Sequence, residues 1–353
     1  MIENQFTELL KMKYPIIQAP MAGGITTNSL VSAVSNNGGL GMIGAGYMDP
    51  EQLKNQVREL KTQTKIFGVN LFVPNDFLLV ENKMKTANKA LETVLAKFNL
   101  EKNVALPTKE SFSENYFEQI KVVAEEKVPV CSFTFGVPTK VIIDELKEEG
   151  IFVIGTATTV EEAIHIEQLG MDAVVAQGYE AGGHRGNFLQ TNQRSIGVMS
   201  LVPQIVDHVS IPVIAAGGIM DGRGLAASLC LGAEAVQMGT AFLTTTESGA
   251  NQVHKEAVLE AAEQEIVETR AFSGKYAQGI RNTFIDAMTE YEKDLPDFPI
   301  QNALTQPMRK AAAIHKDKEY MSLWSGQSPR LAKNQTVKKL IEDTMREAGE
   351  MIK

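Results

Sequence analysis

Residues 212–242 read PVIAAGGIMDGRGLAASLCLGAEAVQMGTAF, and this stretch decides the fold. It holds two short apolar runs, 212–218 and 235–242, which give way to glycine at Gly217, Gly218 and Gly239. Apolar runs of this length without polar alternation are typical of parallel strands that are buried on both faces. We therefore predict two buried strands here, each followed by a glycine-rich turn that leads into a helix.

The same pattern recurs six times earlier in the chain. The runs lie at 15–20 (PIIQAP), 39–44 (GLGMIG), 67–73 (FGVNLFV), 128–136 (VPVCSFTFG), 151–157 (IFVIGTA) and 173–178 (AVVAQG). Between them lie helical signals: Thr158 with Glu161, or Thr159 with Glu162, fits a capping box, and Gly170 supplies the stop. Eight buried strands alternating with helices predict an α/β fold, a (β/α)8 TIM barrel, because doubly wound sheets usually have fewer strands and a Rossmann fingerprint.

Two segments exceed a minimal barrel. Residues 75–127 contain no glycine and are charged and helix-prone, so we predict a helical insertion after the third strand. Residues 247–353 contain further helix-like runs and the turn-rich YEKDLPDFPIQN, and we predict a helical extension that caps the barrel mouth. The barrel itself is then assigned to residues 1–74 and 128–246.

Composition and charge exclude several classes of function. The 353 residues are 44% apolar, which argues against disorder, and the net charge of −9 would repel a phosphate backbone. Cys131 and Cys230 stand apart and form no disulfide framework or zinc pattern. The N-terminal segment has no apolar stretch of signal-peptide length, and no apolar run of 18 residues, as a membrane span needs, occurs in the sequence. We expect a cytoplasmic protein with no nucleic-acid partner, no membrane association and no metal site.

Strands seven and eight end in the loops where barrels bind phosphate. Gly217 and Gly218 follow strand seven, and Gln237-Met238-Gly239-Thr240 follows strand eight. Glycine-rich loops that lead into helix N-termini offer backbone N–H groups and a positive dipole end to a phosphate. The alternative is that both are tight turns in which glycine supplies a positive φ. The pair together favours a phosphorylated ligand.

His184 is the candidate catalytic residue. It lies in the loop GYEAGGHRG after strand six, at the catalytic end of a barrel, and an imidazole is the usual proton acceptor or donor near neutral pH. The alternative is a loop histidine bonded to a backbone carbonyl. Asn70 and Gln177, at the ends of strands three and six, would hydrogen-bond a flat heteroaromatic ring, unless they satisfy backbone at the barrel rim. The other four histidines are predicted to be structural or exposed.

The segment 39–44 also matches G-x-G-x-x-G, the dinucleotide-binding pattern. That motif needs a strand before it and a helix after it, whereas here a helix-like segment precedes it and the motif is itself the strand. We interpret these glycines as small residues where the backbone approaches a neighbour.

These motifs carry a family resemblance. QAPMAGG at strand one, GVNLF at strand three, GYEAGGHRG after strand six, AAGGI at strand seven and QMGT at strand eight occur in order, followed by RAFSGKYAQGIRN and SLWSGQS. The chain resembles the nitronate monooxygenases, formerly called 2-nitropropane dioxygenases. The resemblance implies an FMN-dependent barrel enzyme that oxidises alkyl nitronates, including propionate 3-nitronate, with O2 to carbonyl compounds and nitrite.

The resemblance also assigns roles to residues. His184 would bind the nitronate, as an imidazolium or N–H donor, and could remove the α-proton of a neutral nitroalkane. The implied FMN contacts are those to the phosphate, by Gly217, Gly218, Gln237, Met238, Gly239 and Thr240, and those to the rest of the flavin, by Met21, Asn70, Gln177 and Gly182. A role in detoxification follows from the family alone.

Other functions remain open at this level. The same G-x-E-S/A-G-G-H loop resembles that of FMN-containing enoyl-acyl-carrier-protein reductases, and some relatives are NADH:quinone reductases. A phosphosugar lyase or isomerase would use the same phosphate loops but usually needs a lysine or carboxylates at strand ends, and the eight runs contain no lysine. A flavin-binding sensor without catalysis is a further alternative. The helical additions offer a face for a homodimer.

Overall fold

The predicted barrel is confirmed by a computed structural model, which describes residues 4–101, 104–189 and 195–352. Eight parallel strands follow the order β1-β9-β8-β6-β5-β4-β3-β2, and a bridge between Ile17 and Leu40 links the two ends of the sheet. Each strand lies within one of the eight predicted runs. They are β1 (Ile16–Gln18), β2 (Met42–Gly44), β3 (Gly68–Phe72), β4 (Val130–Thr134), β5 (Phe152–Ala157), β6 (Ala173–Gln177), β8 (Val213–Ala216) and β9 (Ala235–Met238).

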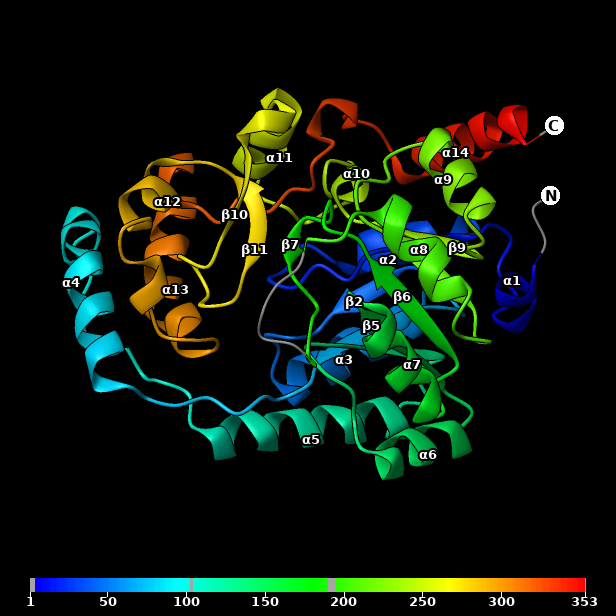
Figure 1. Cartoon of the computed structure of the whole chain (residues 1–353), viewed down its shortest axis with the longest axis horizontal. Helices are drawn as coiled ribbons and strands as arrows, with labels where there is room; N and C mark the ends of the chain where they lie inside the picture. The colour runs from blue at the N-terminus through cyan, green and yellow to red at the C-terminus, as the bar shows by residue number, and fades with distance from the viewer. Residues whose placement is uncertain (1–3, 102–103, 190–194, 353) are drawn as a thin grey trace.

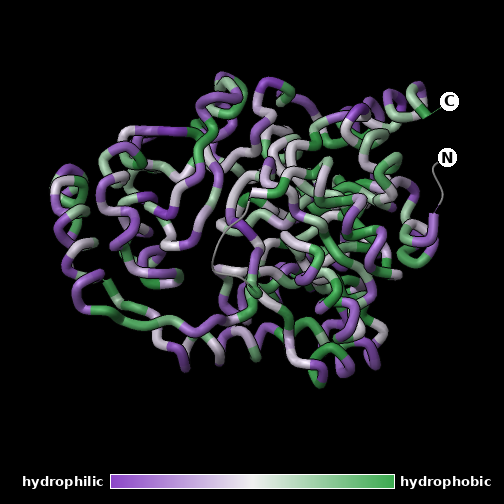
Figure 2. Tube along the Cα trace, viewed as in Figure 1, coloured by the Kyte–Doolittle hydropathy of each residue, from purple (hydrophilic) through white to green (hydrophobic). Residues whose placement is uncertain are grey.

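Helices surround this barrel because each strand is followed by an amphipathic segment that needs an apolar surface to cover. The surrounding helices are α2 (Asn28–Asn36), α3 (Pro50–Lys61), α5 (Lys109–Glu125), α6 (Lys140–Glu148), α7 (Val160–Gln168), α8 (Val198–Val206), α9 (Gly222–Cys230) and the short α10 (Thr240–Leu243). The largest apolar cluster lies between these helices and the strands. Figure 2 shows the apolar residues gathered in this part of the molecule.

The helix starts and the glycine packing follow local rules. Thr159 caps α7 by accepting a hydrogen bond from the Glu162 backbone, and Gly170 ends the turn after it with a φ of +85°. In the segment 39–44, a Cβ on Gly41 would lie 2.2 Å from the Val31 carbonyl oxygen. The glycines there allow close backbone approach, as the sequence analysis interpreted them.

A second apolar cluster fills the barrel interior and the end of the barrel at which the strands begin. It includes Ile17, Met42, Val130 and Ile214, and Phe6 of α1 (Gln5–Leu9) joins it at that end. The Phe6 backbone N–H donates to the Glu234 carboxylate at 2.7 Å, and its ring packs edge-on against Phe152. The barrel is therefore packed solid at one end, so a ligand site has to lie at the other.

The two additions meet in a second lobe beside the barrel (Figure 1). Helix α4 (Glu81–Lys97) comes from the predicted insertion, while α11 (Gln252–Glu260), α12 (Thr283–Met288) and α13 (Ile300–Ile314) come from the C-terminal part. Side chains of α4, α12 and α13 share one apolar core that includes Leu91, Phe284 and Leu304. The predicted segment 75–127 thus divides, because its other helix, α5, packs against α3 and β3 of the barrel.

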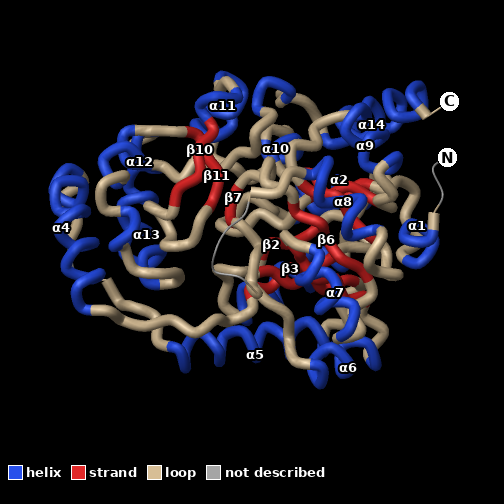
Figure 3. Tube along the Cα trace, in the orientation of Figure 1, coloured by secondary structure: helices blue, strands red, loops and turns tan. Residues whose placement is uncertain are grey.

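This lobe also contains strands that the sequence analysis did not predict. Strand β10 (Ile266–Thr269) pairs with β11 (Ala277–Ile280), and β11 pairs with β7 (Gly183–His184), all antiparallel. Figure 3 shows this small sheet between the barrel and the helices of the second lobe. It joins the loop after β6 to the C-terminal part of the chain. Among the described residues, no helix has the length and apolarity needed to span a membrane.

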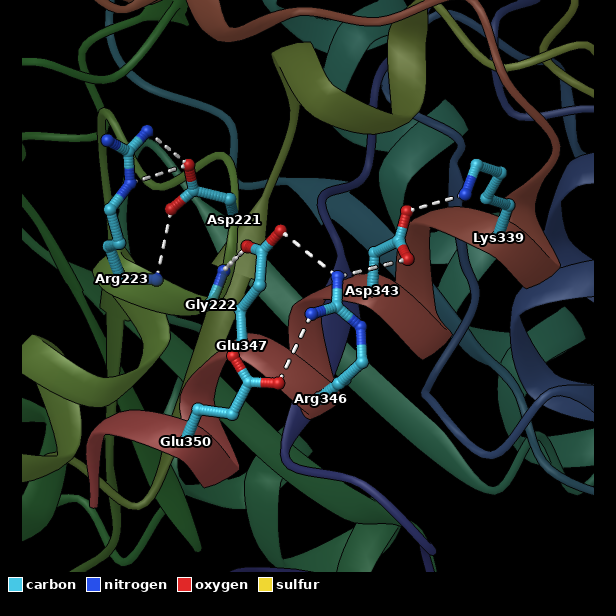
Figure 4. Close-up of polar contacts among 8 residues, drawn as sticks. All are labelled: Asp221, Gly222, Arg223, Lys339, Asp343, Arg346, Glu347 and Glu350. Carbon is cyan, nitrogen blue, oxygen red and sulfur yellow. Dashed lines mark hydrogen bonds and ion pairs between the residues drawn. The ribbon is translucent and has the colours of Figure 1, made fainter. Parts of the chain in front are cut away.

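The last helix returns to the barrel. Helix α14 (Val337–Met351) packs against α9 and α2, and the Glu347 carboxylate accepts a hydrogen bond from the Gly222 N–H at 3.2 Å (Figure 4). A Cβ on Gly222 would lie 2.4–2.5 Å from atoms of α14. Asp221 caps α9 next to this contact. The C-terminal helix therefore fixes the start of α9, four residues after the loop that holds Gly218.

Four 3-10 turns complete the second lobe and its connections. They are η1 (Glu263–Glu265), η2 (Glu292–Asp294), η3 (Lys318–Tyr320) and η4 (Pro329–Leu331).

Candidate functional site

A cavity opens at the carboxyl ends of the barrel strands, with an empty volume of about 1250 Å³ that includes its open mouth. This is the end at which barrel enzymes carry their active sites. Its lining combines strand ends with a crossing segment from the C-terminal part of the chain. Strand ends supply Ala19, Met21, Asn70, Ser132, Thr134, Thr156, Gln177, Ala216 and Gln237, and the crossing segment supplies Trp324, Gly326 and Ser328.

The two glycine-rich loops line one corner of this cavity. Gly217 and Gly218 have φ values of +122° and +66°, which side chains rarely adopt. At Gly239 a Cβ would meet only Ala19, at 3.6 Å, so a side chain there would project into the corner. Ser328 also lines it, and the Thr240 hydroxyl accepts a hydrogen bond from the Gly326 N–H at 3.0 Å. We call this corner, formed by Gly217, Gly218, Gly239, Thr240 and Ser328, the glycine cradle, because it leaves room for a ligand group beside backbone N–H and hydroxyl groups.

Asn70 and Gln177 both lie at the cavity, but they have different partners. The Asn70 side-chain amide donates to the hydroxyls of Ser132 and Thr134, at 2.9 and 3.0 Å. The Gln177 side chain donates to the His184 carbonyl at 3.1 Å and accepts from the Gly186 N–H at 2.7 Å. Gln177 therefore satisfies backbone at the rim, the alternative left open above, and in doing so it fixes the loop that carries His184.

His184 lies in the cavity wall, and its ring is bonded to a serine from the second lobe. His184 Nε2 is 2.8 Å from the Ser273 hydroxyl, which donates to the Lys275 carbonyl at 2.9 Å. A carbonyl can only accept, so the serine proton points to it and the serine oxygen accepts from a protonated Nε2. Nδ1 has no partner among the described residues and is not sealed from the cavity. Its lone pair is therefore free.

Aromatic rings surround this imidazole. Phe135, Trp324 and Phe298 have ring centroids 5.6, 5.5 and 6.2 Å from that of His184. Burial among them, together with the positive charges of Lys275 and Arg309, lowers the pKa of His184 to about 3. His184 is consequently neutral near pH 7. Neither form expected for nitronate binding fits: burial disfavours the imidazolium, and the one N–H of the neutral ring, on Nε2, already donates to Ser273.

Lys275 is a cation whose charge acts on His184 and whose amine is held by hydrogen bonds. Its Nζ donates to the backbone carbonyl and side-chain oxygen of Asn187, at 3.1 and 3.2 Å, and lies 5.0 Å from the Phe135 ring centroid. Burial lowers the pKa of Lys275 to about 8. The amine is therefore still largely charged at neutral pH.

The cavity brings together nearly all of the residues predicted as a site. His184, Met21, Asn70, Gln177, Gly182, Gly217, Gly218, Gln237, Gly239 and Thr240 line it, and Met238 does not. Met238 is 1% exposed and packs in the core between strands and helices, because alternate residues of a strand face opposite sides. At Gly182 a Cβ would lie 2.4 Å from the Gly326 nitrogen, so this glycine admits the crossing segment.

Sequence reasoning missed the residues that come from the second lobe. Ser273, Trp324 and Ser328 lie on no barrel strand, and no spacing rule places them at the cavity. Their signal was present in RAFSGKYAQGIRN and SLWSGQS, which were quoted for the family resemblance without a role. His254, predicted to be structural or exposed, is buried and bonds the Trp324 carbonyl at 2.9 Å.

Comparison with known proteins gives the family of this site. The family model described as nitronate monooxygenase matches residues 3–347. The chain belongs to the nitronate monooxygenase family. A probable nitronate monooxygenase of Staphylococcus haemolyticus is 52% identical over 343 residues, covering 96% of this chain and 95% of that one. One from Staphylococcus aureus is 49% identical over 353 residues, covering 99% and 98%.

Two solved structures share the architecture of this nitronate monooxygenase family member. A nitroalkane oxidase from Streptomyces ansochromogenes superposes with a TM-score of 0.91 at 38% identity, covering 98% of each chain. FabK from Thermotoga maritima superposes with a TM-score of 0.79 at 35% identity, covering 100% of this chain and 98% of that one. The family is one of oxidoreductases and its members are flavoenzymes, so a flavin is the implied cofactor. The glycine cradle next to a wide, aromatic-lined cavity fits such a group.

Proposed function

We propose that this chain is an FMN-dependent nitronate monooxygenase, which oxidises alkyl nitronates such as propionate 3-nitronate with O2 to carbonyl compounds and nitrite. The observation that carries the proposal is the neutral His184, held by Ser273 among aromatic rings, in the same cavity that the glycine cradle lines. The family match and the nitroalkane oxidase neighbour support it. A cytoplasmic role in removing toxic nitronates is part of the proposal and rests on the family.

The cradle residues would hold the cofactor. Gly217, Gly218, Gly239 and Thr240, with Ser328 beside them, would bind the FMN phosphate through backbone N–H and hydroxyl groups. Met21, Asn70, Gln177 and Gly182 would lie along the rest of the flavin. When bound, FMN supplies the redox chemistry, accepting electrons from the substrate and passing them to O2.

The residues of this chain would bind the substrate and handle its proton. His184 Nδ1 has a free lone pair, so it would accept the α-proton of a neutral nitroalkane and so generate the nitronate in the site. Ser273 would keep the proton on Nε2 and fix the plane of the ring. Phe135, Phe298 and Trp324 would exclude water from the reacting carbon.

One titration tests this function. The purified protein should show flavin absorption, and ethyl nitronate added without oxygen should bleach it, with air restoring the colour and releasing nitrite. A parallel cuvette receives NADH in place of the nitronate. Bleaching by NADH and not by nitronate would refute the proposal.

An NAD(P)H-dependent reductase is the second candidate function. The observation in its favour is the FabK neighbour at 35% identity, together with the resemblance of the GYEAGGHRG loop to enoyl-acyl-carrier-protein reductases. The nitroalkane oxidase superposes more closely, at a TM-score of 0.91 against 0.79. NADH oxidation with a quinone or an enoyl thioester, measured in the same preparation, decides between the two.

A further inference from the structure

Glu180 is an acidic residue of the loop GYEAGGHRG to which the chemistry described so far gives no role. It is half-buried and does not belong to the residues that line the cavity. Both of its carboxylate oxygens accept from the backbone N–H of Val198, the first residue of α8, at 3.0 and 2.9 Å. The carboxylate thus fixes the start of α8, where the helix dipole favours a negative charge.

Three glycines leave room for the Glu180 side chain. A Cβ on Gly178 would lie 2.5 Å from its Oε2, and a Cβ on Gly197 would lie 2.9 Å from its Oε1. A Cβ on Gly218 would lie 3.2 Å from the Glu180 Cβ. The three glycines belong to the loop after β6, the segment before α8 and the loop after β8. Glu180 is therefore packed against the back of the loop that carries one wall of the glycine cradle.

The backbone of Glu180 holds the crossing segment. Its carbonyl accepts from the Gln327 N–H at 3.0 Å. Ser328, the next residue, lies so close to the loop after β8 that a Cβ on Gly218 would be 3.4 Å from the Ser328 hydroxyl. The residue that fixes the start of α8 thus also holds the segment that brings Ser328 to the cradle.

We infer that Glu180 is a positioning residue for the phosphate end of the cofactor: it joins α8, the loop after β8 and the crossing segment, and so presents Gly218 and Ser328 in the arrangement that binds a phosphate monoester. The inference rests on the proposed function for the identity of the cofactor. A site that is already held in its binding arrangement loses less conformational entropy when the ligand binds, so its affinity is higher. His184 is held separately, by Ser273 and by the pairing of β7 with β11.

The test compares FMN with riboflavin, which has the same ring and ribityl chain but no phosphate. The full chain, stripped of flavin by dialysis, is titrated with each flavin, and the quenching of flavin fluorescence gives Kd. E180A should raise the Kd for FMN by about tenfold or more and that for riboflavin by less than about twofold, because only FMN uses the cradle. E180Q keeps one acceptor oxygen for Val198 and should cause a smaller rise, again for FMN alone. At saturating FMN, the kcat of both variants should stay within about twofold of the wild type, because His184 keeps its own contacts.

E167A is the matched control. Glu167 of α7 is also half-buried, and its carboxylate accepts from the Ser210 backbone N–H at 2.6 Å, but this contact lies where β8 begins and not at the cradle. E167A should leave both Kd values within about twofold of the wild type. S328A should weaken FMN binding directly. Because Glu180 acts through Ser328, the free-energy effects of E180A and S328A on FMN binding should add to less than their sum in the double variant.

Equal effects of E180A on FMN and riboflavin, no effect on either, or full additivity with S328A would overturn the inference. If E180A does not fold, E180Q carries the same comparison. A wild type that binds FMN no more tightly than riboflavin would also overturn it, while nitronate oxidation is measured independently. If the wild type prefers FMN through Glu180 but no nitronate bleaches the bound flavin, the proposed function fails and the role of Glu180 stands.

Discussion

Replacing Glu162 by Gln should destabilise the protein, because this carboxylate joins the start of α7 to the loop that follows β7. Its side chain is 0% exposed. One oxygen accepts from the Thr158 backbone N–H and hydroxyl, at 2.7 and 2.8 Å, and the other from the backbone N–H groups of Phe188 and Leu189, at 2.6 and 3.1 Å. The sequence predicts a capping box of Thr159 with Glu162 as one of two alternatives; Thr159 does cap α7, but the Glu162 carboxylate bonds Thr158 and the loop in place of the Thr159 backbone N–H.

The size of the effect follows from these four bonds. A glutamine keeps one acceptor oxygen and turns an N–H2 group toward the other pair of donors. The Thr158 hydroxyl can rotate to accept from that group, but the Thr158 backbone N–H is left buried without an acceptor, at a cost of about 1–3 kcal/mol. Loss of charge at the remaining bonds adds to this, for a total of about 3 kcal/mol. With an unfolding entropy of about 2.1 cal/mol/K per residue, 353 residues give a fall in Tm of about 4 °C.

Scanning calorimetry and urea unfolding at pH 7 measure this change. The matched control is Glu148→Gln, which removes one carboxylate from an exposed position on α6 and should leave Tm within about 1 °C. A Glu162→Gln protein that melts as late as this control would show that the four hydrogen bonds contribute nothing net, and the reasoning would be refuted.

Three further predictions follow from single contacts. Gly222→Ala should lower the free energy of unfolding by about 1–3 kcal/mol, measured by urea unfolding, because the new Cβ would lie 2.4–2.5 Å from atoms of α14. Gly349→Ala is the control and should not destabilise the protein, because a Cβ there meets nothing within 4 Å. Equal unfolding curves for the two variants would contradict this prediction. Ser273→Ala should lower nitronate kcat/KM about tenfold at unchanged flavin content. The kcat/KM of the wild type should not fall between pH 8 and pH 5, since the pKa of His184 is about 3. A fall in kcat/KM near pH 6.5 would mean that His184 titrates as an ordinary histidine. Burial lowers the pKa of His254 to about 4, so as the pH falls the unfolded chain binds this proton first, near pH 6.5. The free energy of unfolding should therefore fall between pH 6.5 and pH 5, by up to about 1.4 kcal/mol per pH unit from this residue. His254→Gln should flatten that slope in urea unfolding.

The barrel could be predicted from the sequence because its signals are local. Each strand lies in a short apolar run, and each run is read without reference to the rest of the chain. The residues that line the cavity could also be predicted from the sequence, because parallel strands in a barrel bring their carboxyl ends together, whichever residues lie there. Met238 shows the limit of this argument, because the motif QMGT gives its position but the strand's alternation turns its side chain into the core.

The charge state of His184 could not be predicted in this way. An imidazole in a loop of glycines suggests an ordinary pKa, and the rings that lower it come from three distant parts of the chain: Phe135 after β4, Phe298 before α13 and Trp324 beyond it. Ser273, which sets the proton on Nε2, lies in a turn between two strands of the small sheet. These contacts are fixed by packing between lobes, which has no period in the sequence.

The same contacts argue that the C-terminal part is a component of the site and not a cover added to a finished barrel. The barrel supplies the glycine cradle and the loop of His184, but the bond to His184 Nε2 comes from Ser273, the crossing segment brings Ser328 to the cradle, and α14 holds the start of α9 through Gly222. Antiparallel pairing of β7 with β11 fixes the backbone of His184 itself to this part. Because the barrel and the C-terminal part hold each other, the position of the imidazole relative to the cradle depends on the docking of the two lobes. A substitution at the boundary between the lobes should therefore lower turnover while the barrel remains folded.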